Sequence, residues 1–145
     1  MKLKATRIQV WRASIDDRVG GAAERLEPLA QAGADLEFVF ARRTPELPGA
    51  GVVFVAPVKG AKVVRAAREA GFSQPADIHF LRIEGANKSG LIGAVTRALA
   101  DAGISFRGVS ASVLGRSSVA YIAFDAAADA TKGARVLSRI GQGGS

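Results

Sequence analysis

The sequence repeats one pattern at a fixed offset of 70 positions. Without gaps, this offset places glycines on glycines and apolar residues on apolar residues: Ile8 on Ile78, Gly20 on Gly90, Leu29 on Leu99 and Gly33 on Gly103. A repeat of this length encodes a whole group of helices and strands rather than a single element. The chain of 145 residues is therefore expected to fold into two similar units.

Each half predicts the same order of elements: strand, helix, strand, strand and helix. Apolar alternation marks the strands, and apolar residues at helical spacing mark the helices. In the first half, the predicted elements span 7–12, 21–32, 36–41, 52–56 and 59–70, after a polar lead-in at 1–6. In the second half, they span 78–83, 91–102, 104–113, 119–124 and 126–140, before a tail at 141–145 that we expect to be disordered. Pro28 predicts that the first helix is kinked or regular only after Glu27, because proline removes one helical hydrogen bond.

This order predicts the fold class: α+β, with two ferredoxin-like βαββα(β) units whose helices cover one face of antiparallel sheets. The domains are expected at 1–74 and 75–145, with the boundary near Ser73-Gln74-Pro75. Neither half offers an evident fourth strand after its second helix. Two explanations stay open: the halves share strands, or the N-terminal strand of one half completes the sheet of the other.

The sequence has no cysteine and one histidine, His79. It therefore excludes disulfides, thiolate metal sites, cysteine nucleophiles and clusters of histidine around a metal. No apolar run approaches the roughly 18 residues of a membrane span, and the basic N-terminus lacks the apolar core of a signal peptide. We expect a cytoplasmic protein that does not bind membranes. His79 is expected on the open face of a sheet or in an interface, and Trp11 on the corresponding face, where it would mark a contact between subunits.

The formal net charge is +7, which suits either an anionic partner or a solvated surface rich in arginine. We favour the solvated surface, because the basic residues are scattered and the aromatic residues fall mainly at positions assigned to the core. The nearest approach to a basic cluster joins Arg42-Arg43 with Lys59, Lys62, Arg65 and Arg68. RNA binding by an open sheet usually needs exposed aromatic rings for stacking, so nucleic acid is not the expected partner.

Catalysis is not expected either. Asp16 and Asp17 are adjacent, so their side chains point apart, and neither His nor Lys is nearby to complete an acid–base site. The segment Gly85–Gly90 does not match a phosphate-binding loop, because Leu91-Ile92 follows where that loop has Lys and then Ser or Thr. An enzyme of the acylphosphatase sort would need Arg and Asn together at such a loop, and the sequence offers no such pair. We expect no metal and no cofactor.

The second half carries a motif that runs from Glu84-Gly85-Ala86-Asn87-Lys88-Ser89-Gly90-Leu91 through Val95 and Leu99 to Ala102-Gly103-Ile104-Ser105. This motif resembles the sequence core of ACT domains, which are small βαββαβ modules that bind amino acids and regulate metabolic enzymes. The first half resembles it more weakly, since it keeps the glycines of Asp16–Gly21 and Ala32–Asp35 but carries Pro28. The resemblance covers nearly the whole chain as two copies, and it implies a stand-alone tandem ACT domain protein.

The turn before the first helix of the second half is the candidate ligand site. A helix N-terminus presents free amides and a partial positive charge, which suit a carboxylate. Asn87 could accept a hydrogen bond from an amino-acid ammonium, and Ser89 could bind the carboxylate. The resemblance implies the same place, because ACT domains commonly hold their ligand between this turn and a strand of a neighbouring copy. The expected ligand-binding residues are Asn87, Lys88, Ser89, Gly90, Leu91, Ile104 and Ser105.

A simpler interpretation is that Asn87 and Ser89 only shape this turn, with Ser89 as the helix N-cap. The matching turn of the first half carries Asp16 and Asp17, which would repel a carboxylate. We therefore expect the first half to be a copy that does not bind, the alternative being that it binds through another edge.

Together these features predict a non-catalytic regulatory sensor that binds an amino acid at an interface between ACT-type units. The expected partners are the amino-acid ligand, a second copy of the chain in a homodimer, and an enzyme or regulator that the sensor modulates. The alternative is a ligand-independent protein-interaction module, followed by a nucleic-acid-binding protein.

Overall fold

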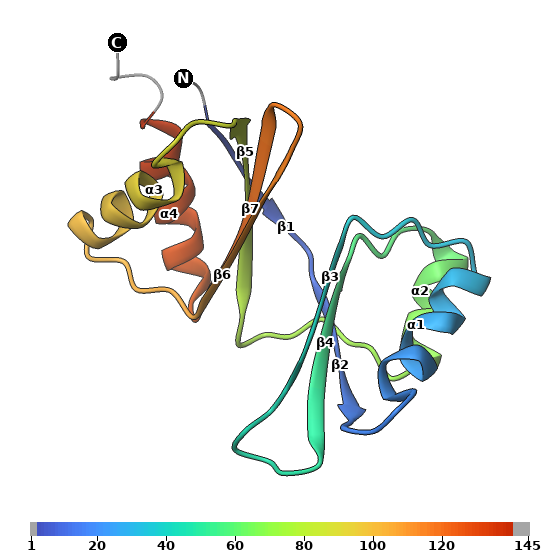
Figure 1. Ribbon diagram of the computed structural model, residues 1–145. Coiled ribbons are helices and arrows are strands. Elements are labelled where there is room, and N and C mark those ends of the chain that lie inside the picture. Colours follow the sequence, from blue (N-terminus) through green and yellow to red (C-terminus); the bar gives the residue numbers. More distant parts are fainter. Residues whose placement is uncertain (1–2, 141–145) are drawn as a thin grey trace. The chain divides into compact units, whose positions relative to one another are not determined.

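The computed structural model describes residues 3–140, which form two compact units (Figure 1). The inserted unit comprises residues 9–75, and the outer unit comprises residues 3–8 together with residues 76–140. Residues 1–2 and the predicted tail at 141–145 lie outside the described residues. This division differs from the expected domains, 1–74 and 75–145, mainly because the start of the chain packs with the second half.

The outer unit has a four-stranded sheet made of β1 (Lys4–Ile8), β5 (His79–Ala86), β6 (Gly108–Leu114) and β7 (Ser117–Phe124). The strands lie in the order β1-β5-β7-β6, and all neighbours are antiparallel. Two helices, α3 (Leu91–Asp101) and α4 (Ala127–Ser138), share one apolar core with the sheet and cover one of its faces (Figure 1). The central side chains of this core are Leu81, Ile83, Val95, Leu99, Ile122, Phe124, Ala130 and Leu137.

The fourth strand of this sheet comes from the start of the chain. β1 pairs with β5, with Lys4 opposite Glu84 and Ile8 opposite Phe80. Leu3, just before β1, is only 3% exposed and packs into the core of the outer unit. Of the two explanations for the missing strand, the one in which the N-terminal strand of one half completes the sheet of the other is confirmed.

The predicted lead-in at 1–6 and the predicted single strand at 7–12 are wrong. The chain instead forms β1, which ends at Ile8, and β2 (Trp11–Asp16), which belongs to the other sheet. The apolar alternation of Ile8 and Val10 changes phase at Trp11, so that the adjacent residues Val10 and Trp11 are both buried. This change of phase marks the break, but alternation records which face of a strand a residue occupies and not which sheet the strand joins.

The inserted unit contains β2, α1 (Gly21–Gln31), β3 (Phe38–Arg43), β4 (Ala50–Ala56) and α2 (Ala61–Glu69). Its strands are antiparallel in the order β2-β4-β3. Beside β2, Ser73 takes the place of a fourth strand through two backbone hydrogen bonds with Arg12, of 2.8 and 2.9 Å. Both units therefore follow the plan that the repeat predicts, and the predicted α+β fold with two ferredoxin-like units is confirmed.

Trp11 lies in the core of the inserted unit. Its side chain is 4% exposed and packs in one cluster with Leu29, Val53 and Phe72. The guanidinium carbon of Arg68 lies 5.4 Å from the centre of the indole ring, in the range of a cation–π contact. The expected role of Trp11 in an exposed subunit contact is therefore wrong, because Trp11 faces the apolar core of its own unit. His79 is half-buried, with its Nε2 3.2 Å from the carbonyl oxygen of Ala76.

Glycines end the first helix of each unit, as predicted. Gly33 and Gly103 follow α1 and α3 with φ of 87° and 74°, a conformation that glycine adopts at little cost. In each unit the chain then bonds back to the helix, with 3.0 Å between Ala34 N and Leu29 O and 2.9 Å between Ile104 N and Leu99 O. Pro28 lies inside the last turn of α1 without ending the helix. The predicted strand at 104–113 begins later, at Gly108, which leaves residues 104 and 105 in the connection.

Because Leu3 packs in the core of the outer unit, its side chain should stabilise that unit. Leu3→Ala should destabilise the outer unit by about 2–5 kcal/mol, the usual cost of removing a buried leucine side chain. In hydrogen exchange, amide protection should fall in β5, β7 and α4, while β2 and β4 keep their protection. Lys4→Ala is the control, because Lys4 is exposed. A loss of protection centred on residues 9–75 would contradict the assignment.

Candidate ligand-binding site

The turn between β5 and α3 opens the helix without a side-chain cap. Gly90 is the N-cap, with φ 82°, and no side chain bonds to the first amides of α3. The amide of Leu91 donates to the carbonyl of Lys88 at 3.1 Å. The prediction of Ser89 as N-cap is wrong, because the left-handed turn at Gly90 shifts the start of the helix by one residue. The first-turn amides at Ile92 and Gly93 therefore have no side-chain acceptor within residues 3–140.

The turn is fixed against the hairpin that joins β6 to β7. The amide of Asn87 donates to the carbonyl of Arg116 at 2.7 Å. The hydroxyl of Ser118 donates to the carbonyl of Gly85 at 3.2 Å. These two bonds hold the end of β5 and the tip of the hairpin together, so the turn and β6 form adjacent walls.

A cavity of about 280 Å³ lies between these walls. Five of the predicted ligand residues line it, namely Asn87, Lys88, Ser89, Gly90 and Leu91. Its remaining lining comes from β5, α3, β6 and β7: Ile83, Ile92, Val95, Ala111, Ser112, Val113, Ser118, Val119 and Ala120. The structure thus brings the predicted turn to a concave site. Ligand binding by these residues stays a prediction.

Ile104 and Ser105, the other two predicted ligand residues, do not line the cavity within the described part of the chain. Ile104 is 5% exposed and packs in the core of the outer unit, whereas Ser105 is exposed. Sequence reasoning placed them beside the turn because it started β6 too early. It also missed the wall that β6 and β7 contribute, and the available signal was the alternation of Val109, Ala111 and Val113 on one face of β6.

Lys88 is the one charged side chain that lines the cavity among residues 3–140, and it is exposed. Leu91, Val95 and Ile83 provide an apolar interior, of which Val95 and Ile83 are almost fully buried. The cavity therefore combines a polar, positively charged turn with an apolar wall. A small molecule with a carboxylate and an apolar part matches this combination.

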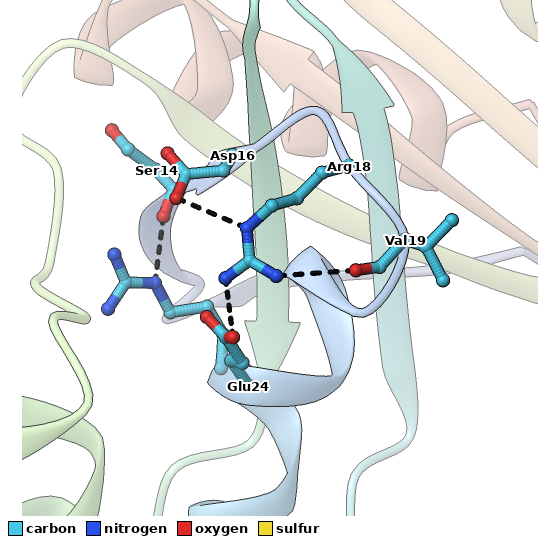
Figure 2. A network of polar contacts seen from close by, with 6 residues as sticks. Ser14, Asp16, Arg18, Val19 and Glu24 are labelled. Carbon is cyan, nitrogen blue, oxygen red and sulfur yellow. Dashed lines mark hydrogen bonds and ion pairs between the residues drawn. The ribbon is translucent and has the colours of Figure 1, made fainter.

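In the inserted unit, the matching turn is filled by its own side chains. Figure 2 shows Arg18 reaching from this turn to Glu24 in the first turn of α1, and also to Asp16 with a shortest distance of 3.7 Å. The hydrogen bond from Arg18, helped by its positive charge, holds the pKa of Glu24 below its ordinary value. The same contact raises the pKa of Arg18. The first turn of α1 therefore already contains a carboxylate, that of Glu24, which is paired with the guanidinium of Arg18.

The inserted unit has a second ion pair, at the positions that correspond to the cavity of the outer unit. Asp17 and Arg43 occupy the repeat positions of Asn87 and Val113, and Asp17 Oδ2 lies 2.9 Å from Arg43 Nε. The two turns are otherwise anchored alike, because the amide of Asp17 donates to the carbonyl of Gly49 in its own hairpin at 3.0 Å. In the inserted unit, the Asp17–Arg43 pair joins the turn to β3. In the outer unit, the cavity lies at the corresponding place, between the turn and β6. This geometry explains why the two halves can share a fold and differ at this site.

Some of the basic residues in the nearest approach to a cluster, Arg42-Arg43 with Lys59, Lys62, Arg65 and Arg68, contact other side chains of the inserted unit. Arg43 pairs with Asp17, and Arg68 stacks on Trp11. Lys62 and Arg65 line an open hollow between α1 and α2 that they share with Glu69. The charge of Arg43 is thus paired with a carboxylate, and the guanidinium of Arg68 contacts an aromatic ring.

No protein-family model matches the sequence, and no curated protein matches it either. Solved structures do match its fold. A protein from Bacteroides thetaiotaomicron superposes with a TM-score of 0.73 and 14% identity, over 90% of this chain and 88% of the other. The ligand-free regulatory subunit of aspartate kinase from Thermus thermophilus gives a TM-score of 0.61 and 16% identity, over 94% of this chain and 95% of the subunit.

The aspartate kinase of Clostridium acetobutylicum matches over 98% of this chain but only 34% of the enzyme, with a TM-score of 0.62 and 13% identity. The chain has an ACT-type fold. The regulatory subunit from Thermus thermophilus matches it over nearly its full length, so the ACT resemblance of the sequence is confirmed at the level of the fold.

Residues 3–140 contain no helix with the length and apolar character needed to cross a membrane. They also contain no group of three or more His, Asp or Glu side chains arranged to hold a metal ion.

Replacing Arg18 with alanine should raise the pKa of Glu24 toward its ordinary value, because the hydrogen bond and the nearby positive charge are lost. NMR titration of the Glu24 side-chain carboxyl measures this. The lowered pKa stabilises the fold above the unfolded-state pKa of Glu24, and this stabilisation is lost as pH falls through the folded-state pKa. The difference in unfolding midpoint between wild type and Arg18→Ala should therefore be present at neutral pH and disappear in acid.

Lys62→Ala is the matched control, since it removes one positive charge from the same unit away from Glu24. It should leave the pKa of Glu24 unchanged. A Glu24 pKa that does not move in Arg18→Ala would show that the contact does not persist in solution.

Proposed function

We propose that the chain is a non-catalytic regulatory sensor that binds an amino acid in the cavity of the outer unit. The observation that carries the proposal is the cavity itself, which opens at the uncapped start of α3 and is lined by the turn from Asn87 to Leu91. Its position in an ACT-type unit supports the same function. The ion pairs at the matching turn of the inserted unit support a single ligand site in each chain.

The chemistry of the turn suits the two charged groups that all amino acids share. The ligand carboxylate lies at the first-turn amides of α3, where the helix dipole favours a negative charge, and Lys88 adds a full positive charge nearby. The side-chain oxygen of Asn87 accepts a hydrogen bond from the ligand ammonium, and the hydroxyl of Ser89 donates one to the ligand carboxylate. The free first-turn amides and the side chains of Asn87, Lys88 and Ser89 are thus each matched to a charged group of the ligand.

Ligand binding is coupled to assembly through β6, the edge strand beside the cavity. On β6, Val109, Val113 and Leu114 are 43%, 54% and 87% exposed, and Val113 also lines the cavity. A second copy that pairs along β6 covers the open side of the site. A ligand held by both copies stabilises the dimer by mass action, and the dimer in turn binds the ligand more tightly.

The regulated target is a partner enzyme or regulator. One of the similar structures is a separate regulatory subunit of aspartate kinase, and another is an aspartate kinase described as an allosteric enzyme. By analogy, this chain transmits its ligand state to a catalytic partner and catalyses no reaction itself. A cytoplasmic location fits this role and the absence of cysteine.

A protein-interaction module without a ligand is the second candidate. The exposed side chains of Val19, at 99%, and Leu114, at 87%, favour it, because large exposed apolar side chains at loop tips suit protein contacts. The two candidates differ in one respect: an interaction module captures its partner equally well with and without amino acids.

A thermal-shift screen with each of the twenty amino acids at millimolar concentration tests the sensor. At least one should raise the melting temperature, and Lys88→Ala should weaken its binding about threefold to tenfold through loss of the carboxylate's counter-charge. Arg135→Ala is the matched control, because it removes an exposed positive charge from the same unit without touching the cavity. Equal effects of the two substitutions would contradict the assigned role of Lys88.

A further inference from the structure

The floor of the cavity is aliphatic. Ile83 of β5, Val95 of α3 and Ala120 of β7 line it and are 3%, 1% and 7% exposed. They belong to the apolar core of the outer unit, so they are fixed by packing on three different elements. A ligand group that reaches this floor leaves water and contacts only carbon atoms.

The upper walls are also aliphatic. Ile92 and Val113 line the cavity from α3 and β6 and are 39% and 54% exposed, so they stand between the floor and the solvent. The turn contributes the polar residues Asn87, Lys88 and Ser89, and β6 and β7 add Ser112 and Ser118, of which Ser118 already donates its hydroxyl to Gly85. One end of a bound amino acid therefore meets polar groups, and its side chain meets apolar ones.

This lining discriminates by charge. No Asp or Glu lines the cavity within residues 3–140, so an ammonium or guanidinium side chain would lose water without gaining a counter-charge. An acidic side chain would place a second carboxylate against the same aliphatic floor. A hydroxyl side chain would meet carbon atoms where it needs a hydrogen-bond partner.

We propose that the ligand of this cavity is an amino acid with a branched aliphatic side chain: valine, leucine or isoleucine. This inference rests on the proposed function and names the ligand class of the same site. The volume of about 280 Å³ lies at the small end for ligand pockets, which suits one amino acid rather than a nucleotide or a peptide.

Isothermal titration of the full chain with leucine, isoleucine, valine, alanine, threonine, lysine and aspartate tests the proposal. Each carbon atom that enters the cavity should tighten binding by about fourfold, so leucine, with three more than alanine, should bind up to about sixtyfold tighter. Lysine and aspartate should bind more weakly than alanine, because their charges cannot be paired at the floor.

A pair of substitutions on β6 tests whether Val113 contacts the ligand side chain. Val113→Asp places a carboxylate on the wall of the cavity and should weaken leucine binding on the order of tenfold. It should also strengthen lysine binding by about twofold to fivefold, because the new carboxylate pairs with the lysine ammonium. Val109→Asp is the matched control: Val109 lies on the same strand and the same face, is similarly exposed, and does not line the cavity.

A third variant closes the cavity by copying the inserted unit. Asn87→Asp with Val113→Arg recreates the Asp17–Arg43 pair and should abolish binding of every amino acid while the melting temperature without ligand stays near that of wild type. If leucine still binds this variant with wild-type affinity, the ligand lies elsewhere and the proposal is overturned.

The remaining outcomes separate this inference from the proposed function. Tighter binding of lysine, threonine or aspartate than of leucine, isoleucine and valine overturns the aliphatic ligand but leaves the amino-acid sensor intact. Binding of none of the twenty amino acids overturns both. Equal effects of Val113→Asp and Val109→Asp overturn the assignment of Val113 to the ligand wall.

Discussion

The pairing of β1 with β5 determines how the rest of this chain is organised. It places residues 4–8 in the sheet of the outer unit, with Ile8 opposite Phe80, so that the inserted unit occupies the chain between two parts of the outer one. Without β1, β5 would be an edge strand with unpaired backbone groups, and Leu3 would leave the core. The unit that contains the cavity therefore depends on residues that the repeat assigns to the other half.

A difference in charge at matched positions distinguishes the two units at the proposed ligand site. Asp17 and Arg43 attract each other across the gap between the turn and the edge strand, whereas Asn87 and Val113 at the matching positions do not. Arg18 and Glu24 add a second pair at the helix start. Exposed ion pairs of this kind contribute little to stability, and here they lie at the positions that correspond to the turn and cavity of the outer unit.

The sequence predicted the repeated plan because glycines at helix ends and apolar alternation are local signals. Gly33, Gly90 and Gly103 all adopt the positive φ that their positions in the repeat require. The sheet to which Lys4–Ile8 belongs could not be predicted, because strand pairing joins residues about 75 positions apart and leaves no local mark. For the same reason, the turn from Asn87 to Leu91 was found and the opposite wall at Val113 was not, since the cavity exists only when β6 folds back beside the turn.

The central claim is that one cavity, in the outer unit alone, binds an amino acid. The most direct measurement is the change in backbone amide chemical shifts when leucine is titrated into the isotopically labelled protein. The account predicts that the shifts concentrate on residues 87–95 and 111–120, the two segments that contain most of the cavity lining, and leave residues 16–24 in place. Shifts centred on residues 16–24, or no saturable shifts at all, would contradict it.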